Sequence, residues 1–592
     1  MALVVQKFGG TSVADSEKIL AAARKAVRAR QQGHQVVMVV SAMGKNTDRL
    51  VELAGEVNDN PPAREMDMLL STGEQVSVAL MAMAIDSMGY EAVSLTGGQI
   101  GIKTDSSHTK ARIHSISTDR MKVLLDEGKI VIAAGFQGID DDLNITTLGR
   151  GGSDTTAVAL AAALNADQCE IYTDVDGIYT TDPRKLPEAC LVRSVCYDEM
   201  LELASVGAGV MHSRSIEFGK KFSVPIHVRN SQTDLPGSLI ADEALTSSLP
   251  VSGAALTKDE ALISIHHVPD VPGTITKLFG PIADRKITVD MIVQNVSDDG
   301  KTTVISFTVP RDEMADAIEA VTPVVEELGG KIGATDQGVS KVSVVGLGMA
   351  QQAGVADRMF RSLADAGINL QIITTSEIKI SALVNRDVAL EALRVVHKEF
   401  ELEKLVSKEL SLEQVASDRE AADLDEVVSR LHGIGMEGLM IDDISLDDTQ
   451  SRITLSRVPN KPGAAATLFE RISAAGIFVD MIVQSYASDQ IADITFTVAC
   501  KQLTEALGIA NALAEEYGCE KVEHKESIGK LSVSGIGLRS HTGVAIGMFE
   551  SLSECGINVE MISTSEVRVN VVVDGADSAK GLACLEKRFT TN

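Results

Sequence analysis

Two motifs that each occur twice constrain the fold of the C-terminal half more than any other feature of this chain. The segment VPDVPGTITKLFGPIADRKITVDMIVQNVS begins at Val268, and VPNKPGAAATLFERISAAGIFVDMIVQSYAS begins at Val458, 190 residues later. A second motif begins at Gly346 and returns at Gly535, 189 residues later. The four units follow the order A-B-A′-B′, and such self-similarity indicates copies of one small folding unit.

Each unit reads as a strand, a glycine-marked turn, a helix and a strand, followed by a further strand and helix, which predicts a small α+β module. An acidic, helix-prone stretch, Leu402–Leu431, lies between the second and third units. Between a connecting helix and a charged tether with no other role, we favour the tether.

The first 245 residues have a different texture, in which short apolar runs alternate with amphipathic segments. The amphipathic segments include Ser16–Gln32 and Thr155–Leu164. Such alternation predicts a mainly parallel sheet covered by helices on both faces. The expected strands are Ala2–Phe8, Gln35–Ser41, Ala92–Leu95, Lys129–Ala134, Gln168–Thr173 and Val224–Val228. We expect domains at 1–245, 246–335, 336–400, 435–524 and 525–592, with a linker at 401–434.

Composition excludes several classes of protein. The chain has 592 residues, too many for one core, and a net charge of −29, which argues against nucleic acid as a partner. No apolar run approaches the length of a membrane span, and MALVVQKFGG lacks a basic region before an apolar stretch, so we expect no membrane partner, no signal peptide and a cytoplasmic location. The seven scattered cysteines predict neither a disulfide framework nor a zinc site.

The first motif with chemical content is KFGGTS, at residues 7–12, directly after the first expected strand. Gly9 and Gly10 let the backbone approach a phosphate closely, and Lys7 adds a fixed positive charge. The spacing differs from a P-loop, because the lysine precedes the glycines. A Gly-Gly pair by itself is more often only a tight turn.

Two further motifs follow expected strands. GRGGSDTT, at residues 149–156, combines glycines with Arg150, which suits bidentate carboxylate binding, and with Asp154. The simpler interpretation is a helix N-cap, but the arginine and the glycines exceed what a cap needs. TDVDGIYTTDPR, at residues 173–184, offers acids and an arginine that could face a metal-bound nucleotide, although acidic turns are usually only solvated.

In this order, KFGGTS, GRGGSD and TDVDGIYTTDPR closely resemble the aspartate kinase family, which has the amino acid kinase fold. Further matches are VVSAMGKNTD, STGEQVS and the Gly135–Gly138 segment GFQG, and the repeated units resemble ACT domains. The resemblance implies a monofunctional enzyme of the cyanobacterial type. Its fold would be α/β, an αβα sandwich with a mainly parallel sheet, followed by four ferredoxin-like α+β ACT modules in two pairs.

The resemblance also implies residue roles. Lys7 and Asp154 would lie at the phosphoryl-transfer centre. The aspartate site would contain Ser41, Thr47, Glu74, Arg150, Gly151, Gly152 and Ser153. The ATP site would contain Lys7, Phe8, Gly9, Gly10, Thr173, Asp174, Tyr179, Asp182 and Arg184. ATP with Mg²⁺ would be the phosphoryl donor, and no dedicated protein metal site is expected.

The chemistry of these residue types agrees with the roles. Phosphoryl transfer depends mainly on positioning and on neutralising charge. Lys7 can neutralise the transferring phosphate, Arg150 can hold the α-carboxylate of aspartate, and Glu74 can pair with its ammonium group. The attacking group is already an anionic carboxylate, so Asp154 is better interpreted as an organiser of Lys7 or the metal than as a base.

One segment departs from the family pattern. Many relatives carry a lysine in a GAKVLH-like segment near the nucleotide, whereas this chain has Gly209 within GAGVMH. A phosphate contact from that lysine is therefore missing, although a backbone amide could replace it. His212, at the end of the segment, is expected to be a structural histidine rather than a ligand.

By resemblance, amino-acid effectors bind between paired ACT modules. The ligand would be framed by the PG turn and DMIVQ segment of one module and by the GIN segment of the next; lysine and threonine are the expected effectors. The implied residues are Pro272, Gly273, Asp290, Gln294, Ile368 and Asn369, and then Pro462, Gly463, Asp480, Gln484, Ile557 and Asn558. Gln351–Ala353 differs from its repeat partner, Ser540–Thr542, so the two pairs are expected to differ in affinity or ligand.

Two alternatives stay open. Another amino acid kinase, such as one acting on glutamate, would share the glycine-rich turns, but STGEQVS and the ACT modules favour aspartate. A catalytically inactive sensor predicts decay at Lys7, Arg150, Asp154 or Asp174, and all four are present. No fused homoserine dehydrogenase is expected, because repeats fill the C-terminal half. Family precedent suggests a homodimer formed through ACT contacts.

Overall fold

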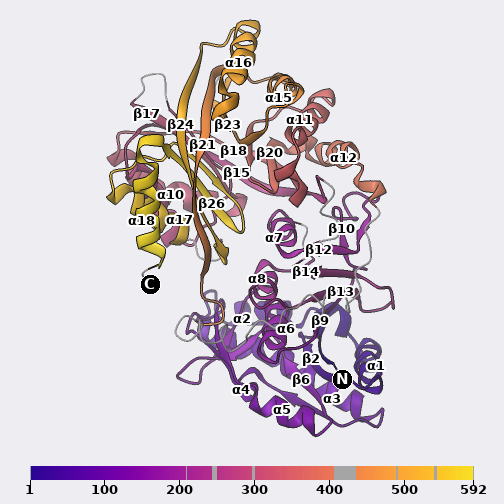
Figure 1. Cartoon of the computed structure of the whole chain (residues 1–592). Coiled ribbons are helices and arrows are strands. Elements are labelled where there is room, and N and C mark those ends of the chain that lie inside the picture. The colour runs from indigo at the N-terminus through magenta and orange to yellow at the C-terminus, as the bar shows by residue number, and fades with distance from the viewer. Residues whose placement is uncertain are drawn as a thin grey trace.

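The computed structural model describes residues 2–207, 210–242, 250–296, 301–405, 435–487, 491–538 and 543–590. Figure 1 shows an N-terminal α/β domain below and a larger assembly of strands and helices above it. Gly209, Ser540–Thr542 and most of the expected tether, residues 406–434, lie outside the described residues.

The N-terminal domain is built on an eight-stranded sheet, and all six strands predicted from the sequence are present in it. The strand order is β12-β14-β13-β9-β1-β2-β6-β3, and every neighbouring pair is parallel except β13 and β14. The strands are β1 (Leu3–Phe8), β2 (Gln35–Val40), β3 (Ala92–Leu95), β6 (Ile130–Ala134), β9 (Gln168–Thr173), β12 (Ser194–Cys196), β13 (Ile226–Asn230) and β14 (Ser238–Ala241).

Helices cover both faces of this sheet. Successive side chains of a strand point to opposite faces, and here both sets are apolar and pack into separate cores. Val36, Met38 and Val40 of β2 pack with the helices of one face, whereas Val37 and Val39 pack with those of the other. The first face carries α1 (Ser16–Gln31) and α3 (Ala63–Asp86). The second carries α5 (Asp119–Asp126), α6 (Gly152–Ala163), α7 (Tyr197–Ser205) and α8 (Ser213–Lys221).

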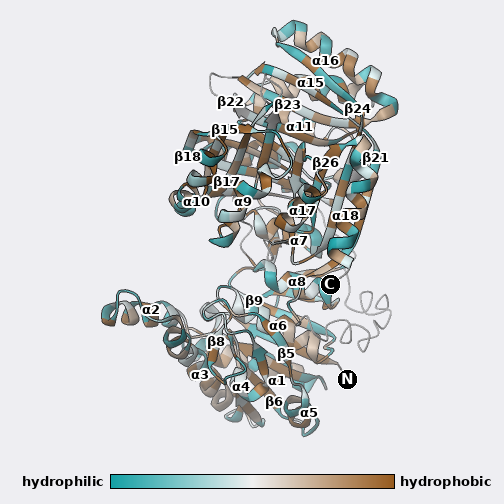
Figure 2. Ribbon diagram, turned by 90° about the vertical axis from the view of Figure 1, so that its left-hand side faces the viewer, coloured by the Kyte–Doolittle hydropathy of each residue, from teal (hydrophilic) through white to brown (hydrophobic). Residues whose placement is uncertain are grey.

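Smaller elements surround the edge of the domain. A second sheet, in the order β5-β4-β7-β8, and the ribbon β10-β11 have strands of two to four residues, too short to give a sequence pattern. The α2 helix (Asn46–Val57) buries none of its residues and projects from the domain (Figure 2). The remaining bounds are β4 (Ile102–Thr104), β5 (Ile113–Ile116), β7 (Gln137–Ile139), β8 (Ile145–Thr147), β10 (Ile178–Tyr179), β11 (Leu191–Val192), α4 (Gly97–Ile100) and the 3-10 helix η1 (Gly10–Val13).

The C-terminal half forms four α+β modules on one twelve-stranded sheet, in the order β16-β17-β15-β18-β20-β19-β22-β23-β21-β24-β26-β25. Modules 1 and 2 contain β15 (Gly253–Pro269), α9 (Thr274–Asp284), β16 (Ile292–Val296), β17 (Thr302–Pro310), α10 (Met314–Glu327), β18 (Lys331–Val345), α11 (Val355–Asp365), β19 (Ile372–Thr375), β20 (Lys379–Asn385) and α12 (Ala389–Glu399). Modules 3 and 4 contain β21 (Met440–Pro459), α15 (Ala464–Ala474), β22 (Val479–Ala487), β23 (Ile491–Ala499), α16 (Leu503–Tyr517), β24 (Lys521–Ile536), α17 (Gly543–Glu554), β25 (Met561–Thr564), β26 (Arg568–Asp574) and α18 (Ser578–Thr590). Module 1 contains α9 and α10, module 2 contains α11 and α12, module 3 contains α15 and α16, and module 4 contains α17 and α18.

Long strands join consecutive modules, so module 1 is nested within module 2 in the chain, and module 3 within module 4. The second part of β15 and the first part of β18 belong to module 1, because they pair with each other beside β17. The first part of β15, Gly253–Thr257, instead pairs with Lys341–Val345 of β18, which pairs with β20 of module 2. Module 2 thus takes one strand from the chain that precedes module 1.

The modules do not pair in sequence order, because each of the first two packs against one of the last two. This corrects the pairing of consecutive modules expected from the sequence. The edge strands β19 and β22 are antiparallel neighbours, with Ile373 opposite Gln484, and modules 2 and 3 share one hydrophobic core. Modules 1 and 4 share another. The repeat order cannot reveal this arrangement, because it depends on which strands remain as free edges after the nested modules fold.

Buried charges join the α/β domain to the modules. The Glu202 carboxylate on α7 is fully buried; it lies 2.8 Å from Lys379 Nζ of module 2 and accepts the Glu566 N–H of module 4 at 2.8 Å. Its neighbour Glu199 accepts the Leu347 N–H at 3.1 Å. A buried charge is tolerated only when it is paired and hydrogen-bonded, so these contacts fix α7 against the modules.

Two further observations bear on the sequence predictions. Cys555 and Cys584 form a disulfide in module 4, so the expectation that the cysteines are unpaired is wrong for these two. The α3 helix is long and apolar enough to cross a membrane, although half of its most apolar window is buried in the fold. Since α3 packs on the sheet, we interpret it as a core helix.

The junction at Glu202 yields a prediction about stability. Glu202→Gln leaves the Lys379 ammonium buried without its counter-charge, which should cost about 3–5 kcal/mol and lower the urea midpoint of the first unfolding transition. Glu401→Gln, which breaks an exposed pair with Lys404, is the control and should leave that midpoint unchanged. Equal midpoints for wild type and Glu202→Gln would show that the pair does not hold the two parts together.

Candidate functional site

The three glycine-containing motifs meet at one edge of the main sheet. β1 lies between β9 and β2, with Phe8 opposite Tyr172 on one side and Val40 on the other. Because these strands are parallel, the segments that follow their carboxyl ends are neighbours, and this edge is where open α/β sheets bind ligands. Gly9 N–H donates to Tyr172 O at 3.3 Å and Ser41 N–H to Phe8 O at 3.1 Å.

Lys7 and Asp154 form an ion pair at this edge. Lys7 Nζ lies 2.5 Å from Asp154 Oδ1, and both side chains are largely buried. Lys7 comes from β1 and Asp154 from the first turn of α6, so the pair joins two of the motifs. Gly10 packs so closely that a Cβ there would lie 2.8 Å from Ala42 O, which explains the glycine.

The Gly149–Asp154 motif forms a tight turn into α6. Gly151 has a φ of +68°, and a Cβ on it would lie 2.3 Å from Cβ of His212, so only glycine fits. His212 is thus in contact with the motif and lines the cleft beside it, and burial lowers its pKa. Arg150 is exposed, and Ser153 is buried beside Gly135.

Glu74 provides a buried acceptor near the same edge. Its Oε1 accepts the Ala42 N–H at 3.0 Å, whereas Oε2 is buried and has no hydrogen-bond partner. Burial raises the pKa of this carboxyl to about 7. A buried carboxylate with one oxygen unsatisfied is suited to an ammonium ligand.

These residues line one open cleft of about 2120 Å³. Its walls include every residue predicted for the phosphoryl-transfer centre and the aspartate site, which are Lys7, Ser41, Thr47, Glu74, Arg150, Gly151, Gly152, Ser153 and Asp154, together with Gly9 and Gly10 of the predicted ATP site. The opposite wall belongs to the modules and includes Glu437, Ile441, Val544, Arg588 and Phe589. The C-terminal modules therefore form part of the wall of the candidate active site.

Of the residues predicted for the nucleotide site, Lys7, Gly9 and Gly10 line this cleft, whereas the others do not. Thr173 ends β9 and Asp174 follows it, next to the Gly9–Gly10 turn, and Tyr179 lies in β10. Asp182 holds the guanidinium of Arg184 in two hydrogen bonds of 2.9 and 3.1 Å. Their nucleotide roles stay predictions.

Phe8 is placed differently from the other members of this group. Its side chain is fully buried and stacks on Tyr172, with ring centroids 4.7 Å apart. Any contribution of Phe8 to a nucleotide site would therefore come from its position in the backbone.

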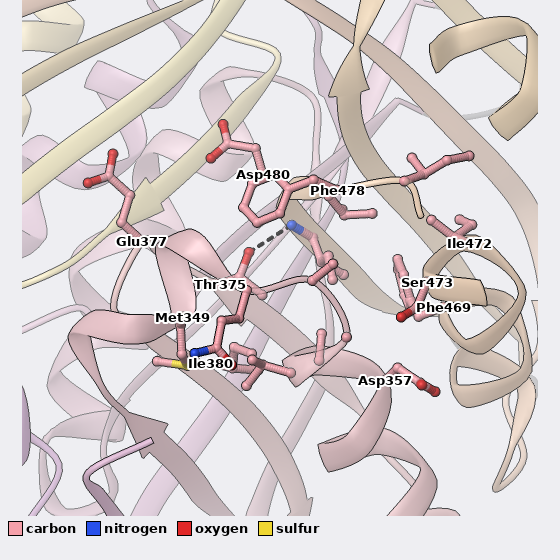
Figure 3. Close-up of a pocket in the computed structure, with 18 of the residues that line it drawn as sticks. Met349, Asp357, Thr375, Glu377, Ile380, Phe469, Ile472, Ser473, Phe478 and Asp480 are labelled. Carbon is pink, nitrogen blue, oxygen red and sulfur yellow. Dashed lines mark hydrogen bonds between the residues drawn. The ribbon is translucent and has the colours of Figure 1, made fainter. Parts of the chain in front are cut away.

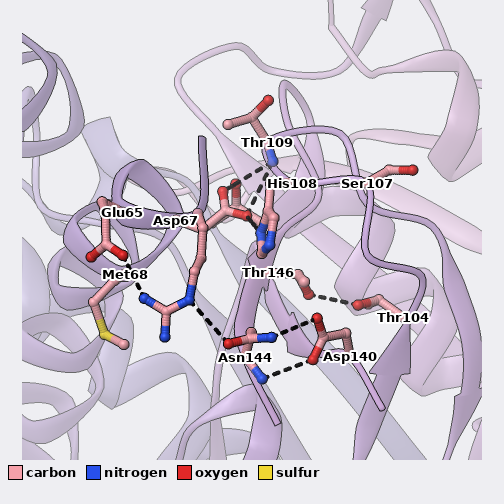
Figure 4. Close-up of polar contacts among 12 residues, drawn as sticks. Glu65, Asp67, Met68, Thr104, Ser107, His108, Thr109, Asp140, Asn144 and Thr146 are labelled. Carbon is pink, nitrogen blue, oxygen red and sulfur yellow. Dashed lines mark hydrogen bonds and ion pairs between the residues drawn. The ribbon is translucent and has the colours of Figure 1, made fainter. Parts of the chain in front are cut away.

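Sequence reasoning missed a polar network behind the cleft (Figure 4). Asp67 of α3 is fully buried and accepts hydrogen bonds from the Thr109 N–H and the Thr147 hydroxyl; its Oδ2 also lies 2.7 Å from His108 Nδ1. It fixes the 105–111 loop and the end of β8, both of which lead to cleft residues. The signal in the sequence was an acid within the apolar face of α3, which also carries Glu74.

The candidate effector residues of modules 1 and 4 converge. Asp270, before the Pro272–Gly273 turn, accepts hydrogen bonds from Gln294 at 3.2 Å and from Asn558 of module 4 at 2.9 Å. Gln294 Oε1 is buried without a hydrogen-bond partner. The structure thus brings the PG turn and the glutamine of module 1 together with the GIN segment of module 4.

Modules 3 and 2 form the corresponding site. Asn369 donates to Asn460 Oδ1 at 3.0 Å, and Gln484 donates to Leu370 O at 2.8 Å. The cavity beside Ile368, Pro462 and Gly463 measures only about 20 Å³, space for a single water. An amino acid can enter there only if the two modules separate.

A roomier pocket of about 230 Å³ lies on the other side of the same interface (Figure 3). Asp480 lines it, rather than the cavity at Gln484, and its carboxylate is 2.5 Å from Lys530 Nζ. Asp290 likewise pairs with Lys341 and lines a pocket of about 100 Å³ between modules 1 and 4. The module 2–3 interface therefore has two candidate pockets and the module 1–4 interface has one beside the Asp270 contacts, and both aspartates already have a lysine partner.

Comparisons with known proteins agree with the geometry. The amino acid kinase family model matches residues 2–230, and ACT domain models match residues 261–325, 342–400 and 531–589. An aspartate kinase of Stutzerimonas stutzeri is 49% identical over 399 residues, and aspartokinase 2 of Bacillus subtilis is 48% identical over 398 residues. Each alignment covers 67% of this chain and 97% of the relative.

Solved structures give the same picture. The aspartate kinase from Synechocystis is 38% identical with a TM-score of 0.52, and the match covers 100% of this chain and 98% of that one. Aspartokinase III of E. coli in complex with aspartate and ADP has a TM-score of 0.58 over 67% of this chain and 99% of its own. At 24% identity, that second likeness shows the fold alone.

Glu74 yields a prediction about pH. An ammonium-bearing substrate needs the ionised carboxylate, so kcat/KM for aspartate should rise as the pH increases through about 7, where Glu74 loses its proton. Glu74→Gln should lower kcat/KM and remove this inflection, whereas Glu65→Gln, at an exposed site on the same helix, should keep it. An inflection that survives in Glu74→Gln would assign it to another group.

Proposed function

The chain belongs to the aspartate kinase family, and from this premise we propose how its own residues carry out the ATP-dependent phosphorylation of L-aspartate. The observation that carries the proposal is the single cleft that holds the Lys7–Asp154 ion pair, the exposed Arg150 and the unsatisfied oxygen of Glu74. These groups supply a cation for phosphate, a cation for carboxylate and an acceptor for ammonium.

In the proposed reaction, a side-chain carboxylate oxygen of aspartate attacks the γ-phosphorus of ATP, the bond to the β–γ bridging oxygen breaks, and ADP leaves with that electron pair. The product is the acyl phosphate 4-phospho-L-aspartate. Lys7 stabilises charge on the transferring phosphoryl group, and Asp154 holds Lys7 in place. Arg150 and Glu74 fix the α-carboxylate and ammonium groups, with Ser41, Thr47 and Ser153 completing the pocket.

Mg²⁺ fits this site as part of the nucleotide complex. It binds through one or two carboxylates together with substrate phosphates and waters, and it neutralises phosphate charge. Asp154 in the cleft and Asp174 at the adjoining strand end are the carboxylates suited to hold it. Among the described residues, no cluster of three or more His, Cys, Asp or Glu side chains forms a separate metal site.

Regulation is proposed at the two interfaces between modules, with lysine and threonine as effectors of a first step in lysine, threonine and methionine biosynthesis. The module 1–4 interface carries Asp270, Gln294 and Asn558, and the module 2–3 interface carries Asn369, Asn460 and Gln484. The two sets differ in charge, since only the first contains a carboxylate. Different ligands or affinities at the two interfaces follow from that difference.

The proposed setting is a cytoplasmic homodimer without nucleic-acid or membrane partners. Both module pairs form within one chain, so contacts between chains are not needed to complete the effector sites. The disulfide in module 4 does not change the proposed compartment, because cytosolic disulfides do occur as redox-sensitive bonds.

The activity is tested by trapping the product. Magnesium, ATP and aspartate should give a hydroxamate when hydroxylamine is present, because an acyl phosphate reacts with that nucleophile. Glutamate in place of aspartate should give little product. Hydroxamate from glutamate but not from aspartate would identify a different amino acid kinase, and none from either would favour an inactive sensor.

The control for this assay is Lys7→Ala. Loss of a charge aimed at the transition state should reduce turnover by roughly 10² or more. Because this change also unpairs the largely buried Asp154, circular dichroism is used to show that the variant is folded. Near-normal turnover would show that Lys7 is not at the chemical centre.

Effector binding is tested by a matched pair of glutamine variants. Gln294→Ala should weaken inhibition through the module 1–4 interface, and Gln484→Ala should weaken inhibition through the module 2–3 interface; dose–response curves for lysine and threonine measure both. Uninhibited turnover should stay close to wild type, because neither residue lines the catalytic cleft. Identical shifts in both variants would show that the interfaces are not distinct sensors, and wild-type inhibition in both would place the effectors elsewhere.

A further inference from the structure

A short segment of the regulatory half lies on the α/β domain. At residues 435–438 the chain runs beside β5, where Met436 N–H donates to His114 O at 2.9 Å and Glu437 N–H donates to Ile113 O at 3.2 Å. Lys221, at the end of α8, donates to Met436 O and Gly438 O. Both backbone and side-chain contacts therefore hold this segment against the catalytic domain.

The Glu437 carboxylate is the centre of these contacts. It accepts from Nη2 of Arg214 at 2.8 Å, from Nε of Arg214 at 3.1 Å and from the Ile113 N–H at 2.9 Å. The side chains of Arg214 and Glu437 are only 16% and 10% exposed. A bidentate, largely buried pair of this kind has a fixed geometry, because few alternative partners are within reach.

Arg214 in turn holds two loops of the cleft. Its Nη1 donates to Leu148 O at 2.5 Å, and its Nη2 donates to Ala111 O at 3.0 Å. Leu148 directly precedes Gly149–Arg150, and Ala111 ends the loop that Asp67 fixes through Thr109. The position of Arg150 therefore depends on the Arg214 guanidinium, and the counter-charge of Arg214 is Glu437, which precedes module 3 in the chain.

The same segment continues into β21, the long strand of module 3. Figure 1 shows this strand reaching from the upper modules down to the α/β domain. Its far end, Pro459, is followed by Asn460 and the Pro462–Gly463 turn, which form the interface with module 2. One continuous strand thus connects the candidate effector site to Glu437.

We propose that Glu437 is a positioning residue for the aspartate site, and that β21 transmits the state of the module 2–3 interface to it. Glu437 touches no substrate; it acts through Arg214 on the loop that carries Arg150. The proposal rests on the proposed role of Arg150 as the group that holds aspartate. Opening the interface would move β21, and with it the Glu437 carboxylate that pairs with Arg214.

The test compares Glu437→Gln with a matched control in the full-length chain. Glu437→Gln should raise KM for aspartate about tenfold, since the buried Arg214 loses a charged hydrogen-bond partner, while KM for ATP and kcat stay within about twofold. The control is Glu560→Gln, which removes an equally buried partner, 11% exposed, from Arg452, 15% exposed. It should leave KM for aspartate unchanged. Glu437→Asp keeps the charge and should fall between wild type and Glu437→Gln.

A second measurement addresses the role of β21. Saturating lysine plus threonine should raise KM for aspartate in the wild type. The ratio of KM for aspartate with effectors to KM without them should fall toward one in Glu437→Gln. Unchanged KM in Glu437→Gln, equal changes in both KM values, or an equal effect of Glu560→Gln would overturn the positioning role. If effectors raise KM for aspartate by the same factor in Glu437→Gln as in the wild type, transmission by β21 is overturned. If Glu437→Gln does not fold, Glu437→Asp must still raise KM for aspartate alone. Hydroxamate formation by the wild type tests the proposed function separately.

Discussion

The buried carboxylate of Glu202 is the constraint on which the arrangement of the two halves depends. It belongs to the α/β domain, but its partners, Lys379 and the amide of Glu566, belong to modules 2 and 4. A charge removed from water in this way must keep its partners, since an unpaired buried ion is far more costly than a broken surface pair. The catalytic domain and the modules therefore cannot shift against each other without a compensating rearrangement at this junction.

The module assembly places candidate effector pockets close to that junction. Lys379 and Glu566 line the pocket of about 100 Å³ between modules 1 and 4. At the other interface, β21 runs from the Asn460 turn to the wall of the catalytic cleft. Glu202 thus contacts both module pairs, through Lys379 of module 2 and the Glu566 amide of module 4, and β21 adds a second connection from the module 2–3 interface to the α/β domain.

The sequence predicted the elements and motifs better than their assembly. Buried strands and the glycine motifs have local signatures, so the sheet and the neighbourhood of Lys7, Arg150 and Asp154 were predictable. The cross-pairing of modules depends on long-range edge contacts between β19 and β22, which leave no local pattern. Asp67, Arg214 and Glu437 were missed because a charged residue acquires a structural role only through partners distant in the chain; for Glu437 and Arg214 the separation is 223 residues.

Coupling between the modules and the aspartate site is the central claim, and reciprocal binding tests it most directly. Calorimetric titration of the full-length chain should measure the Kd of lysine and of threonine with and without saturating aspartate. Linkage requires aspartate to weaken effector binding by the factor with which the effector weakens aspartate binding, typically about 5–150-fold. The same effector Kd with and without aspartate would contradict coupling through the junction and the shared cleft.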